Sequence, residues 1–239
     1  VSLTVTDALG NSDTQILPNF ITVLPSICEE DTIPGMALQL DGTNQYAAIP
    51  ALNLNSNTVT MTAWIKRNGT QNDWGGILFC RGGNTTAGIS IRSTNELRYH
   101  WNDVGYNWSS GLTVPDNEWT HIALVASPTS MKIYRNGIVA TNTTAISPEE
   151  FNAAINIGQD SNGGTRYFKG LIDEVCIYDR SLSQAEIREL MHLTKKPQTE
   201  ANLVGYYQFN NNSTGNTDYD KARVNHATLI NGAPRVPST

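Results

Sequence analysis

Two adjacent carboxylates, Asp173 and Glu174, stand in the middle of an apolar run that reads GLIDEVCIYDR from Gly170 to Arg180. The residues around them are strand formers, whereas Asp and Glu are depleted from strands. Such carboxylates could serve acid–base catalysis, could bind a metal ion, or could mark an exposed sheet edge. Because successive side chains of a strand point to opposite faces, we expect that these two do not act together as a catalytic pair.

Aromatic and amide side chains crowd a second stretch, YHWNDVGYNWSS, over residues 99–110. Sugar rings stack their C–H faces on aromatic rings while Asn and Asp bind hydroxyl groups, so this composition is typical of a carbohydrate-binding surface. In the alternative interpretation, Leu97, Tyr99 and Trp101 alternate inward as core, and only two of the aromatic residues lie on a loop. The candidate ligand-binding residues are Trp74, Tyr106, Asn107 and Trp108.

Other catalytic constellations are missing from the sequence. The chain has no H-E-x-x-H, no G-x-S-x-G elbow and no phosphate-binding loop. Its net charge is −6 and no basic cluster exceeds Lys195-Lys196, whereas nucleic-acid binding requires a basic face. No apolar run approaches the ~20 residues of a membrane span. We therefore expect no catalytic residues, no nucleic-acid partner and no membrane insertion.

Three cysteines, Cys28, Cys80 and Cys176, are too few for a disulfide scaffold, and their spacing fits no zinc motif. Outside the cell, one disulfide plus one free thiol could form. In the alternative, which is more common for free cysteines, they are small buried hydrophobic residues.

Period-2 alternation of apolar residues dominates the chain and predicts strands. Residues 1–25 read as two strands around a Gly-Asn turn, and residues 26–35 read as a linker rich in proline and acidic residues. One helix is expected near residues 183–193, where Ser183 can cap and Glu186 stands three residues on. We predict an all-β fold: a two-sheet antiparallel jelly-roll sandwich, preceded by a β-hairpin from a neighbouring β-sandwich module.

Several of these strands, taken in order, resemble the laminin-G-like or concanavalin-A-like jelly roll, a group that also holds pentraxins. They are ALQLDGTNQYAAIP, VTMTAWIKR, EWTHIALV, MKIYRNGIV and INIGQDSNGGTRYFKGLIDEVCIYDRSLSQAEI. The resemblance implies ligands on a concave face or at rim loops, such as DSNGGTR over residues 160–166. Glucanases of this group carry E-x-D-x-E on one strand, and this chain has no such string. The expected core or core-flanking residues are Trp64, Ile65, Trp119, Ile122, Leu124, Val175 and Ile177.

Both ends of the chain carry further resemblances. Residues 1–25 resemble the last two strands of a polycystic-kidney-disease (PKD) repeat, and residues 36–239 are assigned to the laminin-G-like domain. Within it, residues 201–239 resemble the segment that precedes the LQLDG strand in many such domains, although here they follow the helix. They either complete this sandwich or start a next repeat, and we favour completion.

The resemblance also implies one structural calcium ion. In many members of this fold, paired strands similar to DGTNQY and IDE hold Ca²⁺, which takes six to eight oxygen ligands. In the alternative, Asp173 faces solvent or pairs with an arginine such as Arg180, and in either case Glu174 faces solvent or stabilises the sheet. The residues that would bind the ion are Asp41, Gly42, Asn44 and Asp173.

Together these features favour a non-catalytic extracellular binding or adhesion module of a large secreted or cell-surface protein, with a glycan or a surface protein as partner. The pairing of PKD-like and laminin-G-like segments resembles adhesin-like surface proteins of gliding bacteria, in which neighbouring repeats of the same polypeptide are further partners. Two alternatives stay open. One is a carbohydrate-active enzyme domain, a hydrolase or lyase on the same fold, and the other is a structural spacer without a ligand.

Overall fold

The computed structural model describes residues 2–6, 9–10, 12–16, 35–102, 104–192, 200–211 and 215–238. The chain divides into two compact units, Val1–Thr32 and Ile33–Thr239. In the first unit, β1 (Ser2–Thr6) pairs antiparallel with β2 (Ser12–Ile16), so the predicted hairpin is present. Its assignment to a PKD-like repeat stays a prediction. Cys28 and the predicted linker, apart from Gly35, lie outside the described residues.

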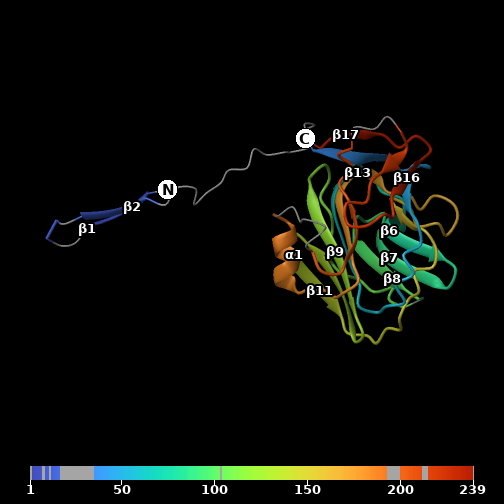
Figure 1. Cartoon of the computed structure of the whole chain (residues 1–239). Helices are drawn as coiled ribbons and strands as arrows, with labels where there is room; N and C mark the ends of the chain where they lie inside the picture. The colour runs from blue at the N-terminus through green and yellow to red at the C-terminus, as the bar shows by residue number, and fades with distance from the viewer. Residues whose placement is uncertain are drawn as a thin grey trace. The chain divides into compact units, whose positions relative to one another are not determined.

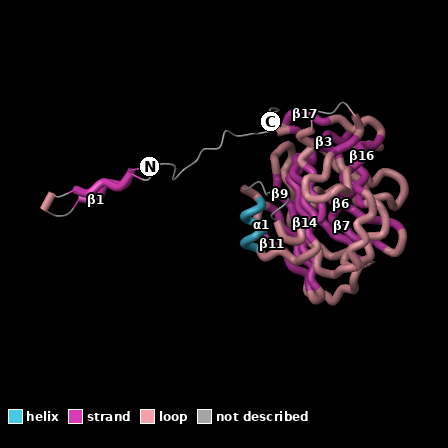
Figure 2. Tube along the Cα trace, in the orientation of Figure 1, coloured by secondary structure: helices cyan, strands magenta, loops and turns pink. Residues whose placement is uncertain are grey.

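The second unit is a sandwich of two antiparallel sheets, as predicted (Figures 1 and 2). The larger sheet has eight strands in the order β11-β10-β9-β5-β13-β3-β17, and β14 pairs with β13 beside this path. Its strands are β3 (Met36–Asp41), β5 (Thr60–Arg67), β9 (Thr120–Ser127), β10 (Ser130–Arg135), β11 (Ile138–Asn142), β13 (Lys169–Tyr178), β14 (Leu203–Tyr207) and β17 (Arg235–Pro237).

The facing sheet has seven strands in the order β15-β16-β4-β12-β6-β7-β8. They are β4 (Tyr46–Ile49), β6 (Gly75–Gly82), β7 (Thr85–Ile91), β8 (Leu97–Trp101), β12 (Ile155–Ile157), β15 (Thr217–Asp218) and β16 (Ala227–Ile230). The C-terminal segment contributes to both sheets, because β14 and β17 pair within the larger one and β15 and β16 within the smaller one.

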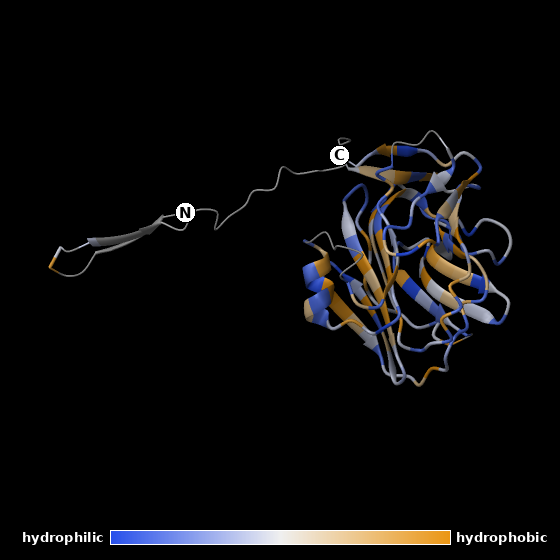
Figure 3. Cartoon of the chain, in the orientation of Figure 1, coloured by the Kyte–Doolittle hydropathy of each residue, from blue (hydrophilic) through white to orange (hydrophobic). Residues whose placement is uncertain are grey.

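One hydrophobic core fills the space between the sheets, built by side chains that alternate inward along most of the strands. Figure 3 shows how hydrophobic and hydrophilic residues are distributed along these strands. Burying one such side chain stabilises the fold by about 1.5–3 kcal/mol. Trp64 and Trp119 only flank this core: the Trp64 ring packs 5.5 Å from that of His121, and Trp119 Nε1 donates to the Ser238 carbonyl at 2.9 Å. The predicted residues that do lie in the core are Ile65, Ile122, Leu124, Val175 and Ile177.

A second, smaller hydrophobic cluster lies on the other face of the larger sheet, beneath the helix α1 (Gln184–Leu190). The helix begins with a capping box, in which Ser183 Oγ accepts from the Glu186 N–H and Glu186 Oε2 accepts from the Ser183 N–H. Its buried residue Ile187 packs in the same cluster as Cys176. The predicted helix is therefore confirmed.

The two described cysteines, Cys80 and Cys176, are both buried, and neither belongs to a disulfide. Cys80 belongs to the core between the sheets and Cys176 to the cluster beneath α1, so both serve as small hydrophobic side chains. Burial raises the pKa of the Cys80 thiol to about 11, which keeps it protonated at neutral pH. Across the described ranges, no helix has the length and apolar character needed to cross a membrane.

Candidate binding site

An open cleft of about 470 Å³ lies beside β6 and β8 on the outer face of the smaller sheet. On β8, Tyr99 and Trp101 belong to the core, so the side chain of His100 between them points outward. On β6, the Arg81 guanidinium lies 5.1 Å from the centroid of the Phe79 ring. The residues that line the cleft are Trp74, Arg81, His100, Tyr106, Asn162 and Arg166.

Three aromatic rings form a continuous platform in this cleft. The rings of His100 and Tyr106 stack with their centroids 5.3 Å apart and an angle of 16° between their planes. The Trp74 ring lies 5.5 Å from His100 and 6.4 Å from Tyr106. Tyr106 is 40% exposed. Trp74 is half-buried and His100, stacked against Tyr106, is only 8% exposed, so Tyr106 and Trp74 are the rings on which a sugar could stack.

Trp74 is held in place by its backbone and by a neighbouring cation. Its φ is +63°, in the left-handed region that non-glycine residues rarely adopt. The Arg92 guanidinium lies 3.9 Å from the indole centroid, within cation–π range, and Arg92 Nε donates to Asp73 Oδ1 at 2.6 Å. The indole is thus positioned before a ligand arrives, which lowers the ordering cost of binding.

Tyr106 is presented by a loop that folds back over a buried ring. The Trp101 N–H donates to the Val104 carbonyl at 3.1 Å, and the Val104 N–H donates to the Trp101 carbonyl at 2.8 Å. Gly105 follows with a φ of +80°, and a Cβ there would lie 2.1 Å from the Tyr99 ring. Only glycine therefore allows the loop to approach Tyr99 this closely.

Two arginines border the platform and share one buried carboxylate. Arg81 donates from Nε to Asp160 Oδ1 at 2.5 Å and from Nη2 to Oδ2 at 3.1 Å, while Arg166 Nη1 donates to Oδ2 at 2.8 Å. The Asp160 side chain is fully buried. Gly76 makes this approach possible, because a Cβ there would lie 2.2 Å from the Asp160 nitrogen. The stretch predicted as a rim loop thus borders the cleft.

The structure brings together two of the four predicted ligand-binding residues, Trp74 and Tyr106. Trp108 lies elsewhere: it is half-buried against the core, with its ring 5.8 Å from that of Tyr99. Asn107 is exposed beside Tyr106, but it does not line the cleft.

Sequence reasoning did not single out Arg81 and His100, and it covered Asn162 and Arg166 only as part of the predicted rim loop at residues 160–166. Strand parity could have found His100, which stands between two residues expected to face inward. The arginines carry no such local signal, because β6 and the 160–166 loop meet only in the folded chain.

The four residues predicted to bind calcium do not lie together, and calcium binding itself stays a prediction. Asp41 lies opposite Lys169, and Asp173 lies four positions further along β13 (169 to 173). At ~3.3 Å per residue, the backbone positions of Asp41 and Asp173 are about 13 Å apart along the strand, farther than two short Asp side chains can bridge to one ion. Calcium ligands lie at about 2.3–2.6 Å from the ion, so one ion cannot bind both. Among the described residues, no three His, Cys, Asp or Glu side chains gather as metal ligands.

Asp41 instead closes a turn. Its Oδ1 accepts the backbone N–H groups of residues 43, 44 and 45 at 2.7, 3.2 and 3.4 Å. Burial raises the pKa of Asp41, but these donors more than offset it, so the pKa lies below its usual value. The carbonyls of Gly42 and Asn44 accept from Asn72 Nδ2 and Asn231 Nδ2 at 2.6 and 2.7 Å. The turn is therefore held by the protein's own donors.

β13 contains a β-bulge at its two carboxylates. In the register with β5, Asp173 and Cys176 are three positions apart, whereas their partners are two positions apart. Glu174 has a φ of +48°. Regular alternation is therefore interrupted at the two carboxylates, because Ile172 and Val175 both join the core although they are three positions apart.

Both carboxylates are held by neighbours within the fold. Glu174 is half-buried, not solvent-facing, and accepts from Tyr206 Oη and, at 3.1 Å, from Gln208 Nε2. Asp173 is 9% exposed and accepts from the Glu174 N–H at 2.7 Å. Burial, and then the charges of Glu174 and Asp218, raise the pKa of Asp173 to about 8. Neither residue lines the aromatic cleft.

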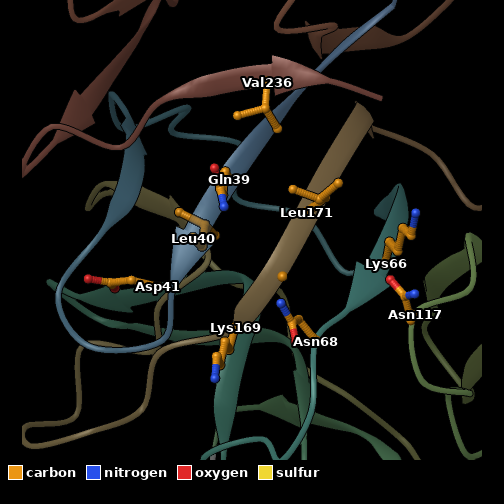
Figure 4. Close-up of a pocket in the computed structure, with 10 residues that line it drawn as sticks. Gln39, Leu40, Asp41, Lys66, Asn68, Asn117, Lys169, Leu171 and Val236 are labelled. Carbon is orange, nitrogen blue, oxygen red and sulfur yellow. The ribbon is translucent and has the colours of Figure 1, made fainter. Parts of the chain in front are cut away.

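A second groove, of about 520 Å³, lies on the outer face of the larger sheet (Figure 4). Leu171 and Val236 supply apolar surface, while Lys66 and Lys169 supply two cations. It is lined by Gln39, Leu40, Asp41, Lys66, Asn68, Asn117, Lys169, Gly170, Leu171 and Val236. None of these carries an aromatic ring, so the groove lacks the stacking surface of the cleft.

Comparison with models of protein families places most of the second unit in a known family. Residues 41–188, more than half of the chain, match the family described as the concanavalin A-like lectin/glucanases superfamily (Laminin_G_3). No curated protein matches.

Three solved structures illustrate the similarity in fold. A Bacteroides ovatus protein to which carbohydrate binding has been ascribed has a TM-score of 0.67 at 19% identity, over 85% of this chain and 60% of that protein. Domain 4 of the extracellular arabinanase AbnA of Geobacillus stearothermophilus, in complex with arabinotriose, has a TM-score of 0.52 at 24% identity, over 64% and 75%. The Trypanosoma rangeli sialidase in complex with sialic acid has a TM-score of 0.50 at 19% identity, over 64% and 27%. This chain thus spans less than two thirds of the first and third proteins, and the likeness establishes the fold.

Proposed function

Because this chain belongs to the concanavalin A-like lectin/glucanase superfamily, we propose that it is a carbohydrate-binding module that holds a glycan in the cleft of Trp74, His100 and Tyr106 without cleaving it. The observation that carries the proposal is the cluster of three rings, 5.3 to 6.4 Å apart, of which Tyr106 is exposed and Trp74 half-buried. Guanidinium and amide groups at its border can bind hydroxyl groups while the rings stack on the apolar face of the sugar.

The chemistry of the cleft supports binding without hydrolysis. Glycosidases use a pair of carboxyl groups on either side of the scissile bond, about 5–5.5 Å apart in retaining enzymes. None of the six described residues that line the cleft carries a carboxylate. The nearby Asp160 is buried and is engaged by Arg81 and Arg166. A hydrolase or lyase on the same fold is the alternative.

The proposal extends to the setting of the module. We place it in a secreted or cell-surface protein of the bacterial adhesin type, next to a PKD-like repeat that the hairpin β1–β2 would end. The resemblances at the two ends of the chain support this setting, and so does the extracellular arabinanase whose domain 4 has a similar fold and was solved with an oligosaccharide. A surface protein as ligand and a spacer role without ligand are the remaining alternatives.

A glycan array followed by calorimetry on the hits tests the proposal. Removing the large side chain in Trp74→Ala or Tyr106→Ala should weaken binding roughly tenfold to a hundredfold, since burying such a side chain contributes about 1.5–3 kcal/mol. Tyr219→Ala is the matched control, because Tyr219 is 46% exposed and also contacts a histidine, His226, with ring centroids 5.0 Å apart. Its affinity should equal that of the wild type.

Two outcomes would contradict the proposal. Equal losses in Tyr106→Ala and Tyr219→Ala would show that the glycan does not bind in the cleft. Release of reducing ends from a bound polysaccharide, abolished by replacing one carboxylate of this chain, would establish the enzymatic alternative. If no glycan binds at all, the spacer or protein-binding alternative takes its place.

A further inference from the structure

The charges around the aromatic cleft do not balance. Arg81 and Arg166 bring two positive charges, and the single carboxylate they share, Asp160, brings one negative charge. Among the described residues, one positive charge is therefore left over at the cleft. Arg92 does not change this count, because its guanidinium pairs with Asp73 at 2.6 Å. The cleft therefore carries a local positive charge, although the chain as a whole has a net charge of −6.

The shared carboxylate is hidden from a ligand, whereas the arginines are not. The Asp160 side chain is 0% exposed, but those of Arg81 and Arg166 are 18% and 24% exposed and line the cleft. Each guanidinium has five N–H donors. Asp160 takes two from Arg81 and one from Arg166, and the Asn162 side-chain oxygen, with its amide flipped, takes two more from Arg166. A ligand on the ring platform thus meets donors and positive charge, while the negative charge lies behind them.

We propose that the cleft selects an acidic sugar, whose carboxylate or sulfate group pairs with Arg81 and Arg166 while its ring stacks on Tyr106 or Trp74. This inference rests on the proposed glycan binding and adds the class of sugar. Guanidinium groups bind planar oxyanions through paired, charge-assisted hydrogen bonds. A neutral sugar would cover the same arginines without supplying a partner charge, and this asymmetry is the source of selectivity.

Two pairs of probes separate ring recognition from charge recognition. The first pair is an oligogalacturonate with free carboxylates and the same oligosaccharide as its methyl ester. The second pair is a carrageenan oligosaccharide and its desulfated form. In calorimetry at low salt, at least one acidic probe should bind tenfold or more tightly than its neutral counterpart, and added salt should shrink that ratio. The pair of probes in which the acidic member binds more tightly identifies the recognised anion as carboxylate or sulfate.

Arg166→Gln tests the origin of the selectivity. It leaves Arg81 and Asp160 as a neutral pair, so the ratio of acidic to neutral affinity should fall to near one, and Arg166→Lys should keep part of it. The control is Arg223→Gln, an exposed arginine outside the cleft, which should keep the wild-type ratio. Melting temperatures of all variants check that the fold is intact.

The outcomes distinguish this inference from the proposed function. Equal binding of both members of each pair would overturn the acidic selectivity and leave glycan binding in place. A ratio that survives in Arg166→Gln would also overturn it, because the charge would then lie elsewhere. If neutral glycans of the array bind but none of the four probes does, the selectivity for acidic sugars is wrong and glycan binding still holds. If no glycan binds at all, both proposals are wrong.

Discussion

Replacing Asp173 with Asn should stabilise the protein at alkaline pH and change little in acid. Burial, followed by the charges of Glu174 and Asp218, raises the pKa of Asp173 to about 8. An unfolded Asp releases its proton near pH ~3.9. Between these values the folded state holds a proton that the unfolded state has released, so stability falls as the pH rises through this window. Asn removes the ionisation and keeps an oxygen that can accept the Glu174 N–H.

The magnitude follows from the size of the shift. A pKa raised from 3.8 to about 8 corresponds to about 6 kcal/mol at ~1.4 kcal/mol per unit. This is an upper limit, because structural relaxation and water penetration reduce the penalty of a buried charge. We expect Asp173→Asn to raise the free energy of unfolding by about 2–4 kcal/mol at pH 9 and by less than about 1 kcal/mol at pH 5.

Urea unfolding at pH 5, 7 and 9 measures this difference. The control is Glu118→Gln, which changes an exposed carboxylate and should stay within about 0.5 kcal/mol of the wild type at each pH. A difference between Asp173→Asn and the wild type that is the same at all three pH values would refute the reasoning. Destabilisation by Asn at pH 9 would mean that the ionised form is held by a cation, and would restore Asp173 as a metal ligand.

Three further predictions concern the acid limb of stability, the cleft and calcium. Burial lowers the pKa of His121 to about 4, so wild-type stability should fall by up to about 3 kcal/mol between pH 6.5 and 4, and His121→Phe should remove that fall in acid unfolding curves. Gly76→Ala should displace the Asp160 backbone, lowering the melting temperature by several degrees and glycan affinity at least tenfold, as measured by thermal unfolding and calorimetry. A shift in melting temperature on adding millimolar calcium should not be lost in both Asp41→Asn and Asp173→Asn, since these carboxylates are too far apart to share an ion. Loss of the shift in both variants would contradict this.

Local patterns in the sequence were enough to predict most of the fold. Side-chain alternation depends only on neighbours along the chain, and it identified inward residues such as Ile65 and Leu124. The capping box at Ser183 likewise needs only four consecutive residues. The cleft was found in part for the same reason, because Trp74 and Tyr106 were recognisable as aromatic residues in polar loops.

Features that depend on pairing between distant segments could not be predicted in this way. Arg81 and Arg166 come from different parts of the chain and meet only because both bind Asp160. Trp108 has the same loop setting as Tyr106, but it turns toward the core, and nothing in the local sequence separates the two. The positive charge of the cleft could therefore not be predicted from the sequence, because it depends on the contact between the 160–166 loop and β6.

The two carboxylates of β13 stand where that strand changes its neighbour. Pairing with β3 ends at Ile172, and pairing with β14, from the C-terminal segment, begins at Val175. At such a junction the ladder of backbone hydrogen bonds is already interrupted, so a bulge removes few of them. Polar side chains can then bind the backbone N–H and C=O groups that neither neighbouring strand reaches. Asp173 accepts the Glu174 N–H, and Glu174 accepts from side chains on and after β14. The two carboxylates thus lie where pairing with β3 ends and pairing with β14 begins. This change of partner explains their position within an apolar strand without a catalytic role.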